Sequence, residues 1–90
     1  MIVIKKDGRH EPFLSGKIAR SAIASARDQG LHISDKEGEL LSEDVHKMIE
    51  SLRGKNGLTS SYELRMVLSL VLKRFGYTKV AQSYLRDILE

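Results

Sequence analysis

The chain has 90 residues, enough for one modest core, and its 15 lysine and arginine residues against 12 aspartate and glutamate residues give a formal net charge of +3. It contains no cysteine, which excludes disulfides, thiolate zinc sites and cysteine nucleophiles, and its three histidines stand too far apart to suggest a metal site. Since no apolar run could cross a bilayer and no signal peptide is evident, we expect a cytoplasmic protein without membrane contact.

The first segment predicts a β-hairpin over about residues 1–13. Ile2 to Ile4 is β-branched, as strands favour. Asp7 and Gly8 form a strong signal for a tight turn, and Pro12 suits a return strand at the edge of a sheet. Because an isolated two-stranded hairpin is only marginally stable in water, the hairpin should lie on an apolar surface.

Apolar residues at helical spacing predict four helices, over about residues 16–29, 35–53, 61–75 and 78–89. Ser15 is placed to cap the first helix, and the segments Ser34 to Glu37 and Ser60 to Glu63 have the form of capping boxes. The third helix is apolar over most of its circumference and should be the most buried. We therefore expect a single domain over residues 1–90 of α+β class, mostly α, with an N-terminal β-hairpin packed on a four-helix bundle.

The hairpin and the helix after it carry candidate anion-binding residues. In a regular strand Lys5 and Lys6 point to opposite faces, so one can face a ligand while the other faces solvent. Lys17 lies in the first turn of the first helix, where unpaired N–H groups and the helix dipole favour an anion. Glu11 could accept a hydrogen bond from a base amino group, a sugar hydroxyl or a neighbouring lysine. An ordinary solvated hairpin would carry similar residues, so the pattern alone leaves both interpretations open.

A family resemblance favours the first interpretation. The run Val3-Ile4-Lys5-Lys6-Asp7-Gly8-Arg9-His10-Glu11-Pro12-Phe13, followed by Lys17-Ile18, resembles the signature that opens the ATP-cone, in which Val-x-Lys-Arg-Asp-Gly precedes Glu, an aromatic residue and Lys-Ile. Later segments also resemble that family in order: its Ser-x-Glu-Leu helix start at Ser60 to Leu64, and its final pattern at Gly76-Tyr77, Val80-Ala81 and Tyr84. The resemblance covers nearly the whole chain.

The resemblance implies a hairpin lid over a four-helix bundle with a nucleotide between them. It implies that Val3 lines the base region and that Glu11 meets the base or sugar. The residues implied to meet the phosphates are Lys5, Lys6 and Lys17. Thr59 and Glu63 match positions that help to close the pocket in some members. The implied effector is ATP or dATP, which Mg²⁺ could accompany.

Two positions depart from the family pattern. Lys6 replaces the commoner arginine, which keeps the charge but loses the planar fork suited to bidentate phosphate contact. Leu14 occupies a place where many members have Asp or Asn, so a contact to a sugar hydroxyl is expected to be missing.

In this family, ATP-cones occur at the N-terminus of ribonucleotide reductases, in the repressor of reductase genes and fused to certain small-molecule kinases. We expect no catalytic domain after Glu90, and the zinc ribbon of the repressor needs cysteines, which these residues lack. We therefore expect a free-standing or excised allosteric module in which nucleotide occupancy controls homo-oligomerisation or docking on a larger enzyme, such as a ribonucleotide reductase or a kinase. Without metal ligands, a P-loop or a Gly-x-Ser-x-Gly elbow, an enzyme is not expected.

A second interpretation is a small basic helical domain that binds nucleic acid or protein. Its basic residues would be Arg20, Arg27, Arg53, Lys55, Lys73, Arg74 and Lys79. Acidic residues interleave with them and no recognised nucleic-acid-binding motif is present, so nucleic acid is not expected as a partner.

Overall fold

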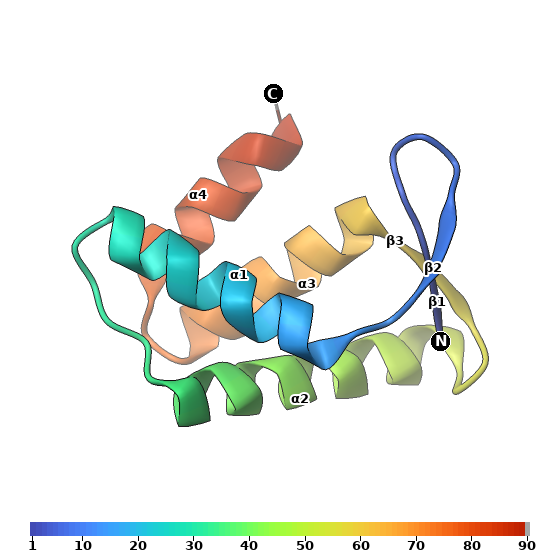
Figure 1. The fold of residues 1–90 in the computed structure, drawn as a ribbon, viewed down its shortest axis with the longest axis horizontal. Helices are drawn as coiled ribbons and strands as arrows, with labels where there is room; N and C mark the ends of the chain where they lie inside the picture. Colours follow the sequence, from blue (N-terminus) through green and yellow to red (C-terminus); the bar gives the residue numbers. More distant parts are fainter. Residues whose placement is uncertain (90) are drawn as a thin grey trace.

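A computed structural model describes residues 1–89, and it places a small sheet at one end of four helices (Figure 1). The elements in chain order are β1 (Ile2–Ile4), β2 (His10–Pro12), α1 (Ser15–Asp28), α2 (Asp35–Arg53), β3 (Leu58–Ser60), α3 (Ser61–Arg74) and α4 (Thr78–Leu89). The predicted fold class, a mostly helical α+β chain with an N-terminal hairpin on four helices, is confirmed.

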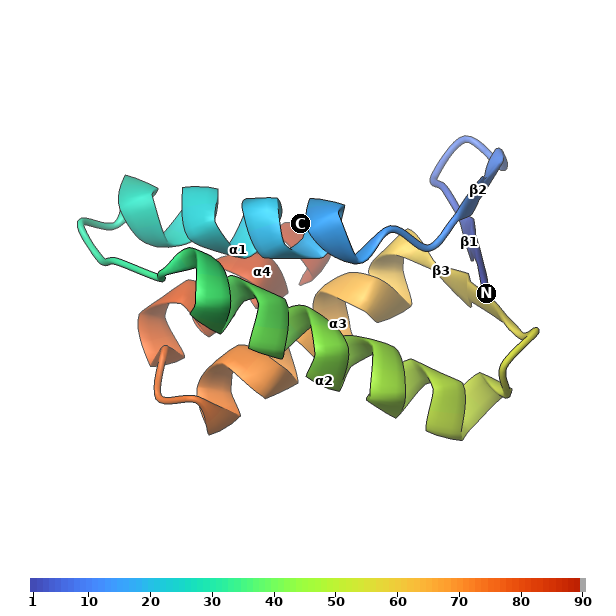
Figure 2. The ribbon, with the colours of Figure 1, turned by 60° about the horizontal axis from the view of Figure 1, so that its bottom comes forward.

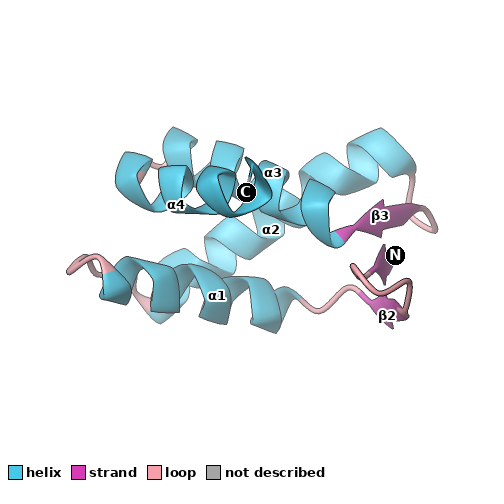
Figure 3. Cartoon of the chain, turned by 90° about the horizontal axis from the view of Figure 1, so that it is seen from above, coloured by secondary structure: helices cyan, strands magenta, loops and turns pink. Residues whose placement is uncertain are grey.

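The sheet has one strand more than the predicted hairpin, in the order β2-β1-β3. β1 pairs with β2 in antiparallel register, with Val3 opposite Glu11, and it pairs with β3 in parallel register, with Val3 opposite Thr59. A strand of three residues directly before a helix has no periodic pattern of its own, so the sequence analysis missed β3. Because β3 runs straight into α3, the pairing brings the start of α3 beside the hairpin (Figure 3).

The hydrophobic core lies among the four helices. Its most buried side chains include Leu41 and Ile49 of α2, Leu72 of α3 and Val80 of α4. The expected burial of α3 holds for one face only. On the opposite face Tyr62, Met66 and Leu70 are about half exposed, at 48%, 50% and 51% of their surface. Their spacing of four residues aligns them in one apolar stripe along the helix.

Small residues let α1 and α2 approach closely near the connection that joins them (Figure 2). Ala22 and Ala26 of α1 are fully buried. A Cβ atom added to Gly38 of α2 would lie 3.1 Å from Ile23 Cδ1 and 3.4 Å from Ala19 Cβ. Gly38 lowers helix propensity, but the absence of its side chain is what allows this contact.

The helix starts match the predictions in part. Ser34 and Glu37 form the predicted capping box of α2, and Ser60 accepts from the Glu63 N–H at the start of α3. The prediction that Ser15 caps α1 is wrong: Ser15 is already helical, and the N-cap residue is Leu14, whose side chain makes no capping hydrogen bond. The chain is still paired with β1 at Phe13, whose N–H donates to the Met1 carbonyl at 3.0 Å, and the helix begins at Ser15, one residue earlier than a Ser15 cap would place its start.

Candidate functional site

A cavity opens between the sheet and the helices. It is lined by residues from β1, β2, α1, α3 and α4 and from the short segment between β2 and α1. Four residues singled out in the sequence line it: Val3, Lys5, Glu11 and Lys17. They come from three separate elements, which the β1–β2 pairing and the turn into α1 bring together. The cavity therefore combines charged groups from the hairpin and α1 with the flank of the helical core.

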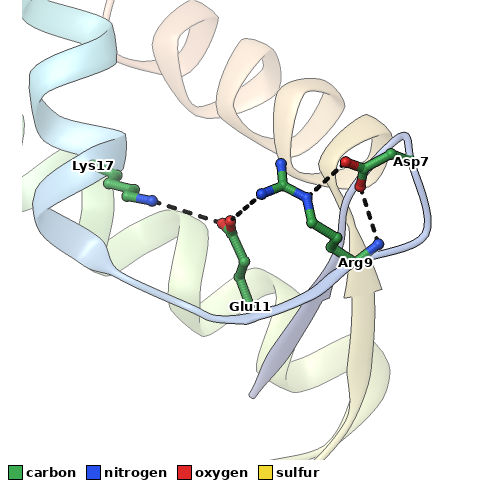
Figure 4. Close-up of polar contacts among 4 residues, drawn as sticks. All are labelled: Asp7, Arg9, Glu11 and Lys17. Carbon is green, nitrogen blue, oxygen red and sulfur yellow. Dashed lines mark hydrogen bonds and ion pairs between the residues drawn. The ribbon is translucent and has the colours of Figure 1, made fainter.

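Glu11 is the centre of a chain of charged contacts at this cavity (Figure 4). One carboxylate oxygen lies 3.7 Å from Lys17 Nζ, and the other lies 3.9 Å from a terminal nitrogen of Arg9. Arg9 in turn donates from Nε to Asp7 Oδ2 at 2.6 Å. Of the three partners that Glu11 could take on sequence grounds, the structure shows the neighbouring lysine and adds Arg9. Since Arg9 and Lys17 are largely exposed and Glu11 is partly exposed, the ion pairs are weak and can be exchanged for other partners.

The first turn of α1 is suited to an anion. It contains no acidic residue and has no side-chain cap, so its N–H groups and the positive end of the helix dipole are not offset by a carboxylate from the helix itself. Lys17 and Leu14 both line the cavity. An anionic group in the cavity would therefore meet a lysine and a helix N-terminus from one side.

The opposite side of the cavity is apolar. Val3 is 5% exposed at the centre of the sheet, and Leu68 and Tyr84 are buried in the helical core. Tyr84 adds one polar group, because its hydroxyl lies 2.5 Å from Ser21 Oγ of α1. A flat aromatic base could pack on the apolar side while charged groups remain at the mouth.

Lys6 lies outside this cavity, in a second, more open depression. That depression is lined by Lys5, Lys6, Asp7, Arg9, Ser61 and Arg65. Lys6 Nζ lies 5.5 Å from the centroid of the Tyr62 ring, the range of a cation–π contact. Lys5, Ser61 and Arg65 line both depressions, so the two adjoin.

Thr59 and Glu63 line neither depression. Thr59 Oγ1 donates to Glu63 Oε1 at 2.7 Å, and Arg53 donates to both Glu63 oxygens, at 3.1 and 2.7 Å. These bonds join the end of α2, β3 and the start of α3. The Arg53 guanidinium, followed by the Thr59 hydroxyl, lowers the pKa of Glu63.

The residues at the cavity that were not predicted to belong to the site include Ser61, Arg65 and Tyr84. Ser61 was noted only as part of a helix start, and Tyr84 as part of the apolar side of the last helix. A signal for Ser61 and Arg65 would have required β3, because its pairing with β1 is what places α3 beside the hairpin.

Among residues 1–89, no group of three or more histidine, cysteine, aspartate or glutamate side chains is arranged to hold a metal ion. Over the same residues, no helix is both long enough and apolar enough to span a membrane.

The comparison with protein families identifies the class. The family model of the ATP cone domain matches residues 1–86. The chain therefore belongs to the ATP-cone family, whose members are nucleotide-binding regulatory modules that take ATP or dATP as effectors.

A curated relative is the transcriptional repressor NrdR 3 of Paramagnetospirillum magneticum, which is 30% identical over 86 residues. The match covers 93% of this chain and 54% of the relative, so the chain spans about half the length of that protein. The expectation that nucleic acid is not a partner is not supported, because this relative acts in transcription. The sequence analysis discounted a repressor because this chain lacks cysteines, but the match leaves about half of the relative outside the comparison.

Proposed function

We propose that the cavity binds ATP or dATP as an effector and that its occupancy controls how the helical surface associates with a partner. One observation carries the proposal: Val3, Lys5, Glu11 and Lys17, taken from the family signature, all line one cavity. The base would pack near Val3, where β1 meets the helical core. Lys5 and Lys17 would meet the phosphates, with Mg²⁺ as a further counter-charge.

The charges of the site suggest how binding proceeds. Glu11 now neutralises part of the Lys17 charge across 3.7 Å of partly exposed space. A phosphate would compete for Lys17, and the Glu11 carboxylate would then be available to the adenine amino group or a ribose hydroxyl. Thr59 and Glu63 would help to close the pocket indirectly, since their bonds hold β3, which pairs with β1, to the end of α2 and the start of α3 rather than reaching the cavity.

The apolar stripe of α3, formed by Tyr62, Met66 and Leu70, gives a route from the nucleotide to a partner. Lys6 is the third lysine that the family resemblance assigns to the phosphates, and its ammonium group lies over the Tyr62 ring at one end of this stripe. Attraction of Lys6 to a phosphate would withdraw the ammonium group from the ring and change the surface that a partner meets. Nucleotide binding can shift the association equilibrium only if the surface that meets the partner differs between the nucleotide-free and the nucleotide-bound chain.

We propose a second copy of the chain as this partner. Residues 61–86 carry five basic side chains and one acidic side chain, whereas α2 carries six acidic and three basic side chains. The segment that carries the stripe is thus complementary in charge to α2 of another copy. In this role the chain is a regulator and turns over no substrate.

The first test is calorimetric titration with ATP and dATP, with and without Mg²⁺, on the wild-type chain and on Lys5→Ala/Lys17→Ala. The matched control is Lys36→Ala/Lys47→Ala, which removes the same charge from α2. We expect saturable binding in the wild type and the control and its loss in the cavity variant. Equal binding in all three proteins would overturn the assignment of the cavity.

The association step is tested separately by sedimentation velocity. We expect ATP to change the mass of the wild-type species and to leave a Tyr62→Ser/Met66→Ser variant unchanged. A nucleotide-dependent mass shift that survives in this variant would place the contact elsewhere.

Control of transcription is a second candidate, favoured by the relative NrdR 3. In this function the basic side chains of α3 and α4 would lie near nucleic acid. The nucleic acid would be bound either by this chain alone or by a larger DNA-binding segment beside it. Binding of duplex DNA that weakens steeply with salt and changes with ATP would support it. No binding at low salt, with or without nucleotide, would remove it for this chain.

A further inference from the structure

The hairpin joins α1 through two residues, Phe13 and Leu14, and both line the cavity. Leu14 does little to fix this connection, because its side chain is about half exposed, at 48%, and makes no capping hydrogen bond. Phe13 is partly buried against the helical core, and its N–H donates to the Met1 carbonyl at 3.0 Å. The Phe13 ring is therefore the side chain that anchors the connection between the hairpin and α1.

The Phe13 ring is stacked on the imidazole of His46, which comes from the middle of α2. The two ring centroids are 4.9 Å apart, and the ring planes meet at 23°. Aromatic pairs in this range add stability beyond the apolar area that they bury. The Glu50 carboxylate lies 3.7 Å from His46 Nε2, one turn further along α2, and forms an ion pair with the imidazole when the imidazole is protonated. α2 thus holds an oriented ring against Phe13.

This stack connects α2 to the cavity. Among the described residues of α2, none lines the cavity, and the side chain of His46 is 45% exposed at the surface of the helix. Phe13 both lines the cavity and contacts His46. Any influence of His46 on a ligand must therefore pass through the Phe13 ring.

We propose that His46 is a positioning residue of the nucleotide site, which holds the Phe13 ring as a wall against which the base or sugar packs. This role rests on the proposed function of the cavity. A ring that is fixed before binding loses little conformational freedom when a ligand packs on it, so the ligand binds more tightly. The phosphates, which Lys5 and Lys17 would meet, do not depend on an apolar wall. His46 therefore supports the adenosine part of the nucleotide and not its phosphates.

Calorimetric titration with adenosine, ATP and inorganic tripolyphosphate tests this role on the wild type, His46→Ala and His46→Phe. We expect His46→Ala to weaken adenosine and ATP binding by the same factor, about fivefold, the size of one aromatic pair, and to leave tripolyphosphate binding unchanged. His46→Phe keeps a ring that can stack, so it should restore most of the affinity. The matched control is His32→Ala, at an exposed position outside the cavity, which should bind all three ligands like the wild type.

A second measurement follows Phe13 without any ligand. Hydrogen exchange of the Phe13 N–H, which donates to the Met1 carbonyl, reports how often the connection opens. We expect this exchange to be about fivefold faster in His46→Ala and close to the wild-type rate in His46→Phe. The Tyr77 N–H, which donates to the Leu72 carbonyl at the opposite end of the molecule (Figure 1), should exchange at the wild-type rate in both variants.

The outcomes separate the role of His46 from the nucleotide site itself. His46 does not act through the Phe13 ring if His46→Ala leaves all affinities unchanged, weakens tripolyphosphate as much as adenosine, or binds no more weakly than His46→Phe; the nucleotide site then stands without it. If the wild type binds neither adenosine nor ATP, the proposed function fails, and hydrogen exchange decides whether His46 fixes Phe13. An unchanged exchange rate of the Phe13 N–H in His46→Ala would overturn the role of His46 in either case.

Discussion

The hydroxyl oxygens of Ser21 on α1 and Tyr84 on α4 lie 2.5 Å apart at the edge of the cavity. The two residues are separated by 63 positions in the chain, and the rest of the Tyr84 side chain is buried, with 4% of its surface exposed. This bond joins the helix that begins at the cavity to the last helix of the chain. It therefore links the cavity wall to the packing of α4.

We expect Tyr84→Phe to lower the free energy of unfolding by about 1 kcal/mol, because the ring stays packed and only the hydrogen bond is lost. Urea denaturation measures this change. Ser21→Ala serves as the partner in a double-mutant cycle, in which the second substitution should cost little once the first is made. Strictly additive effects would show that the two hydroxyls do not stabilise one another.

The helices could be predicted because each carries its own local signals. Ser34 and Glu37 mark the start of α2 and form the bonds that the sequence suggests. The hairpin was predictable for the same reason, since Asp7 and Gly8 specify its turn; Gly8 has a positive φ of 87°, which glycine adopts readily.

What the sequence did not reveal depends on contacts between distant segments. β3 exists because Thr59 pairs with Val3 across 56 positions of chain (59 − 3), and no local pattern encodes that pairing. The consequence for the site is direct. The positions of Ser61 and Arg65 beside the hairpin follow from β3, so Lys5 and Lys17 could be predicted as candidates but the residues of α3 at the same cavity could not.

Leu14 occupies the N-cap position of α1 with extended backbone angles, φ −121° and ψ 106°, and makes no side-chain cap. Asparagine there can accept from a first-turn N–H group. We expect Leu14→Asn to stabilise the chain by about 1 kcal/mol and to raise the melting temperature by about 4–8 °C.

The matched control for this substitution is Leu40→Asn, which changes a similarly exposed leucine within α2. Differential scanning calorimetry compares both variants with the wild type. A melting temperature that rises equally in both, or falls in Leu14→Asn, would contradict a capping effect.

Two carboxylates are expected to make the chain sensitive to acid. The Tyr77 hydroxyl, followed by Ser34, lowers the pKa of Glu37, and Arg53, followed by Thr59, lowers the pKa of Glu63. A carboxyl group whose pKa is lower in the folded than in the unfolded chain stabilises the folded chain at pH values above the unfolded pKa, which is about 4.3 for glutamate. This stabilisation is lost as the pH falls through the folded pKa.

We therefore expect the free energy of unfolding to decrease as the pH falls below about 4, and to decrease less steeply in Glu63→Gln. Urea denaturation at a series of pH values measures the slope. The control is Glu39→Gln, an exposed residue of α2, which should keep the wild-type slope. A Glu63→Gln slope equal to that of the control would show that the Arg53–Glu63 pair adds no stability.

Glu11 faces Lys17 and Arg9, so its removal should have opposite effects on two parts of a nucleotide. Glu11→Gln leaves both cations without this carboxylate, and we expect it to raise the affinity for inorganic tripolyphosphate. If the carboxylate also accepts from the base or sugar, the affinity for adenosine should fall about tenfold. Calorimetry with these two probes separates the effects, with Glu43→Gln on α2 as the matched change of charge. A tripolyphosphate affinity that rises while adenosine binding stays constant would restrict Glu11 to balancing the charge of Lys17, and the contact to the base or sugar would have to come from another residue.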